Sequence, residues 1–184
     1  MTPPRILVIQ GSTRHGRICP KVAAWVTEIG RETSSAAFEI VDLRDWPLPM
    51  DDEPAIPAAG GYVNDHTHAW SRKVAEGDAF VFVTPQYNWG YPAPLKNALD
   101  HLYKEWNDKP AMIVTYGSRG GERCAGQLRQ VVEGLHMRPV ETMPGLKLPR
   151  ALIEANDGNV LPEEHFADDL AQVRQAFAEL AAQL

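Results

Sequence analysis

Residues 84 to 97, Thr-Pro-Gln-Tyr-Asn-Trp-Gly-Tyr-Pro-Ala-Pro-Leu-Lys-Asn, combine aromatic, amide and proline side chains in one short stretch. Three prolines fix the backbone φ angle and remove amide donors, so the stretch is expected to be a stiff loop. Tyr87, Trp89 and Tyr91 alternate with Asn88 and Gly90, which sets flat apolar faces beside exposed peptide groups. Such a surface suits a planar heterocycle with polar edges. The alternative is an aromatic surface loop that packs on itself.

A second candidate loop is Gly11-Ser12-Thr13-Arg14-His15-Gly16-Arg17-Ile18, which lies between an apolar run and a helical pattern. Free amides and the helix dipole favour an anion at such a position, and two hydroxyl and two guanidinium groups add donors. Arg and Ile stand where a Walker A loop needs Lys and Ser or Thr, and the dinucleotide pattern G-x-G-x-x-G is absent. We expect the loop to bind a terminal phosphate monoester. The alternative is that both arginines are solvated surface charges.

A third loop, Gly117-Ser118-Arg119-Gly120-Gly121, follows another apolar run. Its glycine amides are candidate donors to a ligand, and a purely structural turn accounts for the glycines equally well. No metal site is expected, because His66 and His68 fall on different faces of a helix. Cys19 and Cys124 form no CxxC pair, and neither a disulfide framework nor a zinc site is indicated.

The elements that must position these loops alternate between strands and helices. Aliphatic runs predict strands, and apolar residues at helical spacing predict helices between them. The expected strands are Ile6 to Ile9, Phe38 to Leu43, Ala79 to Val83, Ala111 to Thr115 and a weaker Val140 to Met143. The expected helices begin near Pro20 and Asp65 and continue with apolar stripes at 95–102, 128–135 and 166–180. Residues 44–64 are rich in proline and acidic side chains and are expected to be a surface connection.

Five strands that alternate with helices predict right-handed βαβ units and a parallel sheet with helices on both faces. The expected fold is a flavodoxin-like three-layer sandwich with the strand order 2-1-3-4-5. One domain spanning residues 1–184 is expected. In that order the loops after strands 1, 3 and 4 meet at the carboxyl edge of the sheet.

Composition excludes several partners. The formal net charge of −6 gives no sign of the positively charged surface that binds nucleic acid. No apolar run approaches the ~18 residues of a membrane span. We therefore expect a cytoplasmic protein without membrane insertion.

Three motifs carry a resemblance to a known family: Gly11-Ser12 with Arg14, the Pro85-to-Asn97 loop, and Gly120-Gly121. On these motifs the chain resembles the NADPH-dependent FMN reductase family, and within it the branch of fungal quinone reductases. The resemblance implies an FMN cofactor, NADPH or NADH as electron donor, and hydride chemistry at the flavin N5 with no catalytic side chain. The residues it assigns to FMN are Ser12, Arg14, Arg17, Ile18, Pro85, Gln86, Tyr87, Asn88, Trp89, Gly90, Gly117, Ser118, Gly120 and Gly121. Many members have Gly-Ser where this chain has Trp89-Gly90, so a hydroxyl contact is not carried over.

The function expected from the resemblance is two-electron transfer by a ping-pong mechanism to quinones, azo compounds, metal oxyanions or free flavin. Two alternatives stay open, a flavodoxin-type electron carrier and a flavin-based redox sensor or scaffold. Electron carriers typically use an uncharged phosphate loop, in contrast to Arg14 and Arg17. We also expect a homodimer or a dimer of dimers, with contacts from helix 3 and an exposed aromatic surface at His101 to Trp106.

Overall fold

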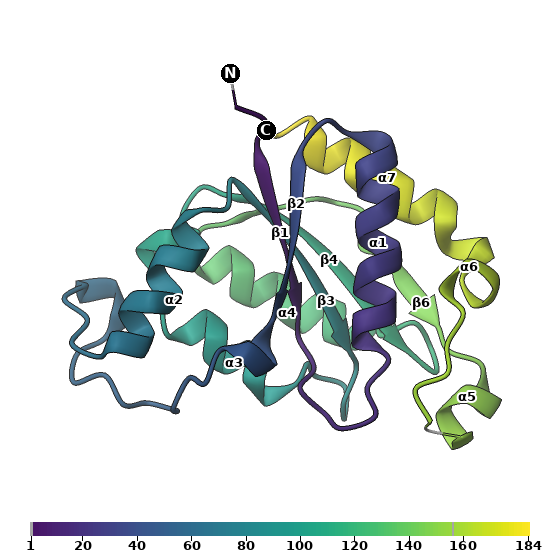
Figure 1. Cartoon of the computed structure of the whole chain (residues 1–184), viewed down its shortest axis with the longest axis horizontal. Coiled ribbons are helices and arrows are strands. Elements are labelled where there is room, and N and C mark those ends of the chain that lie inside the picture. The colour runs from purple at the N-terminus through teal and green to yellow at the C-terminus, as the bar shows by residue number, and fades with distance from the viewer. Residues whose placement is uncertain (1, 156) are drawn as a thin grey trace.

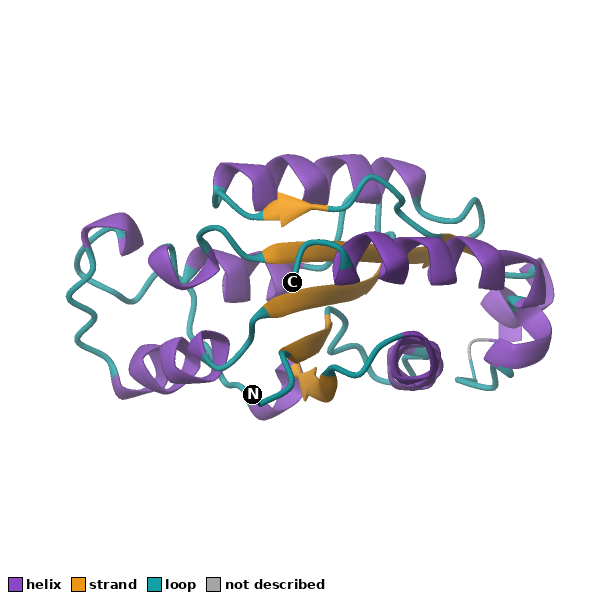
Figure 2. Cartoon of the chain, turned by 90° about the horizontal axis from the view of Figure 1, so that it is seen from above, coloured by secondary structure: helices purple, strands orange, loops and turns teal. Residues whose placement is uncertain are grey.

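The computed structural model describes residues 2–155 and 157–184. It contains an open parallel sheet covered by helices on both faces (Figures 1 and 2). The strand order β2-β1-β3-β4-β5 confirms the predicted topology. The strands are β1 (Arg5–Gln10), β2 (Ala37–Asp42), β3 (Ala79–Pro85), β4 (Pro110–Gly117), β5 (Arg138–Pro139) and β6 (Gly145–Lys147).

The helices divide between the two faces of the sheet. They are α1 (Cys19–Thr33), α2 (Asp65–Ala75), α3 (Ala93–Asp100), α4 (Glu122–Gly134), α5 (Arg150–Ala155), α6 (Pro162–His165) and α7 (Leu170–Ala181). Helices α1 and α7 pack on one face, and α2, α3 and α4 on the other. None of the described helices combines the length and apolar character that crossing a bilayer requires.

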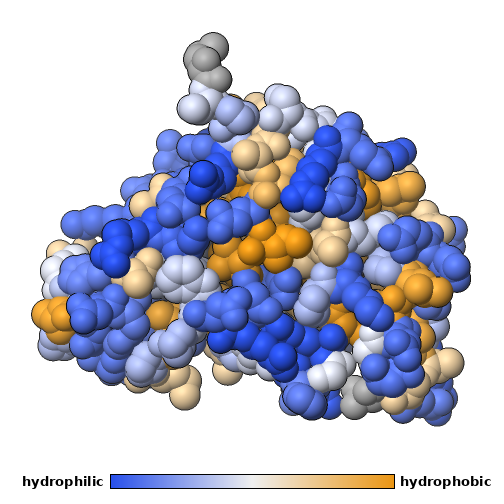
Figure 3. All heavy atoms as spheres, viewed as in Figure 1, coloured by the Kyte–Doolittle hydropathy of each residue, from blue (hydrophilic) through white to orange (hydrophobic). Residues whose placement is uncertain are grey.

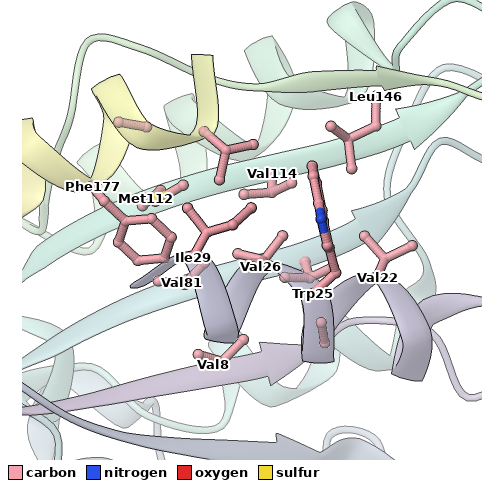
Figure 4. Close-up of a cluster of buried hydrophobic side chains, with 14 of the residues drawn as sticks. Val8, Val22, Trp25, Val26, Ile29, Val81, Met112, Val114, Leu146 and Phe177 are labelled. Carbon is pink, nitrogen blue, oxygen red and sulfur yellow. The ribbon is translucent and has the colours of Figure 1, made fainter. Parts of the chain in front are cut away.

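Successive side chains of each strand point to opposite faces of the sheet, so the protein has two hydrophobic cores, one on each face. On β1, Ile6 and Val8 face α1 and α7, while Leu7 and Ile9 face α2 and α3. Figure 4 shows the first core, in which the buried stripe of α1, including Val22 and Trp25, packs toward the valines of the central strands. Burial on both faces explains why the central strands read as continuous aliphatic runs.

The fifth strand is where the sequence-based prediction was wrong. Val140 to Met143 is not a strand; the edge is instead split into β5 and β6, which both pair with β4. Pro139 and Pro144 have no amide hydrogen to give to a ladder. The Val140 amide still donates to Ala111 O of β4 at 2.8 Å, but the Thr142 amide donates to the Glu179 side chain at 2.8 Å, so the chain leaves the sheet after Val140.

The expected aromatic surface at His101 to Trp106 was also wrong. His101, Leu102 and Trp106 are buried in the subunit, and Trp106 packs on Trp70 and Phe80. The face drawn in Figure 3 is largely hydrophilic, with apolar atoms gathered at its centre, where β2 lies in Figure 1. The helix 3 region therefore offers no free aromatic patch for a dimer contact.

Candidate functional site

The loops after β1, β3 and β4 meet at the carboxyl edge of the sheet around a cleft of about 530 Å³. The volume is within the range of small-molecule sites. Of the sequence-predicted site residues, the cleft lining includes Arg14, Arg17, Ile18, Pro85, Gln86, Tyr87, Gly117 and Ser118. Ser12, Asn88, Trp89, Gly90, Gly120 and Gly121 lie in the same loops but outside this lining.

Two arginines hold the backbone of the first loop by its carbonyl oxygens. Arg17 donates to Ser12 O, and Arg44 donates to Thr13 O at 3.1 Å and to Arg14 O at 3.0 Å. In a trans peptide the N–H points opposite to the C=O. The amides of Thr13, Arg14 and His15 therefore point away from these guanidinium groups. The Arg14 amide donates to Ser12 Oγ at 3.4 Å, whereas the amides of Thr13 and His15 have no protein acceptor among the described residues and are candidate donors to an anion.

Asp42, at the end of β2, fixes Arg17 in this position. Its carboxylate accepts hydrogen bonds from both Nη atoms of Arg17 and from the Arg44 amide. Burial alone would raise the pKa of Asp42, but these hydrogen bonds outweigh it and hold the pKa below its ordinary value. The hydrogen bond to Asp42 likewise raises the pKa of Arg17. The Arg17 guanidinium is thus engaged within the protein, although the residue lines the cleft.

Arg14 differs from Arg17 in being exposed. Its guanidinium carbon lies 5.8 Å from the centroid of the Tyr87 ring, within cation–π range. The Tyr87 hydroxyl lies 3.1 Å from Ser12 Oγ, which is buried. Ser12 therefore joins the first loop to the second, and Arg14 is the guanidinium of the first loop that is free to meet an anion.

The second loop contains a tight turn at Tyr87–Gly90. Tyr87 N donates to Gly90 O at 2.8 Å and Gly90 N to Tyr87 O at 2.9 Å, while φ is +49° at Asn88 and +71° at Trp89. Positive φ at both central positions is typical of a type I′ turn, which favours Asn-Gly, and tryptophan is strained there. Within the described residues, the amides of Asn88 and Trp89 have no protein acceptor. They remain as donors to a ligand.

The Trp89 side chain projects from this turn and is 61% exposed. The guanidinium carbon of Arg123, on α4, lies 3.8 Å from the centroid of its ring. This stacking fixes a large planar surface at the mouth of the second loop.

The third loop divides into two parts with different roles. Gly117 and Ser118 line the cleft. Gly120 and Gly121 have positive φ, and an added Cβ would lie 2.6 Å from Gly145 O and 2.8 Å from the Thr115 side chain, respectively. The amide of Gly120 donates to Gly117 O at 3.1 Å. The structural turn, which the sequence left as an alternative, therefore accounts for these two glycines.

The cleft is also lined by a fourth segment, which we did not assign to the site from the sequence. It contributes Leu148, Leu152, Ile153, Gly158 and Asn159. Strand β6 carries the segment to the cleft: Leu146 pairs with Tyr116, and the Leu148 amide donates to Gly117 O at 2.9 Å. Its only sequence signal is a short apolar run, which carries no chemistry. Leu148, Leu152 and Ile153 supply an apolar wall of the cleft, and Gly158 lies against Gly16 of the first loop.

Both cysteines are free and buried, and neither lines the cleft. Burial raises the pKa of the Cys19 thiol, and burial raises that of Cys124 to about 12. Each thiol is therefore protonated near neutral pH. Protonated, buried thiols are poor nucleophiles.

Comparisons with known proteins identify the family and the fold. A family model described as NADPH-dependent FMN reductase matches residues 4–145. The chain is 53% identical over 180 residues to an NAD(P)H-dependent FMN reductase of Schizosaccharomyces pombe, covering 97% of this chain and 89% of that protein. It is 42% identical over 160 residues to one of Saccharomyces cerevisiae, covering 76% and 84%. A solved flavoenzyme NAD(P)H:(acceptor) oxidoreductase of Paracoccus denitrificans has the same fold, with a TM-score of 0.72 at 20% identity over 98% of both chains.

Proposed function

The chain belongs to the NADPH-dependent FMN reductase family, and from this we propose that it is an FMN-dependent NAD(P)H oxidoreductase that transfers two electrons to a small-molecule acceptor. The acceptor classes we propose are quinones, azo compounds, metal oxyanions and free flavin. The observation that supports the proposal most is the meeting of three donor-bearing loops around one cleft at the sheet edge.

The donors around the cleft fit the two ends of FMN. The amides of Thr13 and His15 and the Arg14 guanidinium suit a terminal phosphate, since backbone amides and guanidinium groups both bind oxyanions. The amides of Asn88 and Trp89 and the backbone of Gly117 and Ser118 suit a heterocycle with polar edges. When bound, FMN supplies the redox chemistry, taking a hydride from NAD(P)H and delivering two electrons to the acceptor.

The side chains that we assign around the cofactor act by binding and positioning. Arg14 offsets the phosphate charge directly. Arg17 and Asp42 keep the loop in its binding conformation, a positioning role in place of the direct phosphate contact expected from sequence. Leu148, Leu152 and Ile153 exclude water from the apolar part of the cleft. Hydride transfer requires no general acid or base from the protein, so we propose no catalytic side chain.

We further propose ping-pong kinetics. The chain contains no second nucleotide-binding motif, so NAD(P)H and the acceptor are taken to occupy the same cleft in turn. The alternative functions are an electron carrier and a redox sensor. The exposed Arg14 in the phosphate loop favours the reductase over a carrier with an uncharged loop.

The proposal extends to the state of the protein in the cell. Two free, buried thiols fit a reducing cytoplasm.

We propose a homodimer or a dimer of dimers. Because His101 and Trp106 are buried, we place the contact surface on the connection between β2 and α2, where Met50, Ile56 and Val63 are exposed. A monomeric mass by light scattering at micromolar concentration would exclude it.

The proposed function is tested by one spectroscopic experiment. The purified protein, reconstituted with FMN, is mixed anaerobically with NADPH and NADH in separate samples. We expect rapid loss of the flavin absorbance near the visible maximum and its return when a quinone is added. Retained absorbance with both nucleotides would favour the electron carrier or the sensor.

A further inference from the structure

Two histidines and one aspartate from separate segments converge outside the lining of the cleft. Asp52 lies in the connection between β2 and α2, His66 in the first turn of α2, and His101 at the C-terminal end of α3. One ligand atom from each lies within 4.8 Å of the other two. His66 Nε2 is 2.9 Å from Asp52 Oδ2, and His101 Nε2 is 3.9 Å from Asp52 Oδ1. The cluster therefore has the donor set of a metal site.

His101 is the informative member, because its side chain is only 4% exposed. His101 Nδ1 lies 2.8 Å from Asn97 O. A carbonyl oxygen can only accept, so Nδ1 carries the hydrogen. Nε2 faces the cluster and has no hydrogen-bond partner among the described residues. A buried nitrogen without a partner is costly, which indicates that something is missing from its surroundings.

The hydrogen bond to Asn97 also prepares His101 as a ligand. In neutral histidine with the hydrogen on Nδ1, Nε2 presents a free lone pair. Metal-binding histidines commonly donate their other N–H to a carbonyl in this way, which fixes the ring orientation. Asn97 is itself held by a hydrogen bond from its Nδ2 to Leu48 O at 2.8 Å. The ring is thus oriented before any ligand arrives.

We propose that Asp52, His66 and His101 bind a divalent transition-metal ion, with Zn²⁺ as the best-fitting ion. Tetrahedral zinc with nitrogen and oxygen ligands at 2.0–2.2 Å separates its donors by about 3.4 Å. Asp52 Oδ1 lies 3.2 Å from His66 Nε2 and 3.9 Å from His101 Nε2, on either side of that value, so small side-chain movements bring the three donors into place. Water completes the coordination, as at zinc sites with three protein ligands.

Neighbouring residues place negative charge around the Asp52–His66–His101 cluster and leave it accessible to a metal ion. A cleft of about 290 Å³ opens beside the cluster and is lined by the carboxylates of Asp51, Glu53 and Asp100. Glu53 accepts from the amides of Val63 and Asn64, and Asp100 pairs with Lys96, so Asp52 is the carboxylate that faces both histidines. The Asp52 and His66 side chains are partly exposed, which leaves an entry path. A bound ion would tie the connection to α2 and α3 at once.

The test is calorimetric titration of ZnCl₂ into the FMN-loaded protein, after removal of any affinity tag and treatment with a chelator. The variants are Asp52→Asn, His66→Gln and His101→Gln. The matched control is His68→Gln, which changes an exposed histidine on the same helix. We expect one Zn²⁺ per chain in the wild type and the control, and a dissociation constant raised more than about tenfold in each ligand variant. Zn²⁺ should also raise the midpoint of thermal unfolding of the wild type and the His68→Gln control, but not that of the three ligand variants.

Three outcomes would overturn the proposal. The first is an absence of Zn²⁺ binding to the wild type. The second is unchanged affinity in Asp52→Asn or His66→Gln, two partly exposed positions that keep the test valid if His101→Gln fails to fold. The third is equally tight binding of Mg²⁺, which prefers oxygen ligands and would mean that the carboxylates act without the histidines.

Discussion

Arg17 and Asp42 form an ion pair through both Nη atoms of the guanidinium and both carboxylate oxygens, and the Arg17 side chain is only 7% exposed. Asp42→Asn leaves this cation without its counter-charge. We expect unfolding free energy to fall by about 2 kcal/mol, since a hydrogen bond to a charged group contributes about 1.5–3 kcal/mol. Urea denaturation measures it. Glu28→Gln, which breaks the exposed Arg31–Glu28 pair on α1, is the matched control and should cost under about 0.5 kcal/mol.

The same ion pair makes the free energy of unfolding depend on pH, and the direction of the change can be predicted. The pKa of Asp42 is lower in the folded protein than in the unfolded chain, so the unfolded chain takes up a proton first as pH falls. The stabilisation is therefore complete above the unfolded value of about 3.9 and is lost as pH falls through the folded value. Denaturation series should show a weaker acid dependence in Asp42→Asn than in the wild type. Equal slopes would contradict the assignment.

Arg14 is predicted to recognise the phosphate of FMN itself. Arg14→Ala should raise the dissociation constant of the apoprotein for FMN about tenfold or more, the loss of one charged hydrogen bond. Riboflavin, which lacks the phosphate, is the internal control and should bind both proteins equally. Flavin fluorescence titration measures both constants. Equal losses for FMN and riboflavin would remove Arg14 from the phosphate end of the site.

The sequence predicted the sheet and the meeting of the loops because both follow from local patterns. Aliphatic runs such as Ile6 to Ile9 are long enough to identify buried strands, and alternation with helices predicts a parallel sheet for which the order 2-1-3-4-5 is a common solution. Three loops at the ends of β1, β3 and β4 necessarily meet at one edge. Neither step needs to know which side chains touch.

The structural features that the sequence did not predict depend on contacts between distant residues. The ion pair of Arg17 depends on Asp42, and the burial of Trp106 depends on Trp70 and Phe80. The closeness of His66 to Asp52 and His101 depends on three separate segments, and the spacing of His66 and His68 carries no information about it. The division of the fifth strand depends on Glu179, which captures an amide that would otherwise join the ladder. Periodicity carries no information about such pairings.

Trp89 is predicted to be a strained residue in its turn. Trp89→Gly creates an Asn-Gly pair, the preferred sequence of a type I′ turn, and should raise the unfolding free energy by about 0.5–1 kcal/mol. Arg123→Ala removes the stacking but leaves the strain, so it should lower the value by about 0.5 kcal/mol. Thermal and urea denaturation of the two variants separate these effects. Destabilisation by Trp89→Gly would show that stacking outweighs strain.

The thiols are predicted to be inert in the native protein. Burial raises the pKa of both cysteines, so the reactive thiolate is scarce at pH 8, and the sulfur atoms are also inaccessible. A disulfide reagent such as DTNB should label neither cysteine in the native state and both in guanidinium chloride. Mass spectrometry after iodoacetamide treatment identifies each site. Rapid native labelling of Cys19 or Cys124 would reopen a redox role for that residue.

The proposed use of one cleft by both substrates predicts the form of the steady-state kinetics. The oxidised nucleotide, NAD(P)+, must leave before the acceptor enters, so varying a quinone at several NAD(P)H concentrations should give parallel double-reciprocal lines. High concentrations of either substrate should inhibit competitively against the other, because each can occupy the form of the enzyme that awaits its partner. Widening the apolar wall by Leu152→Ala should change KM for a bulky quinone more than KM for NAD(P)H, since Leu152 lines the cleft without contributing a polar donor. Intersecting lines would instead require a ternary complex, and the acceptor would then need a binding surface outside the cleft formed by the three loops.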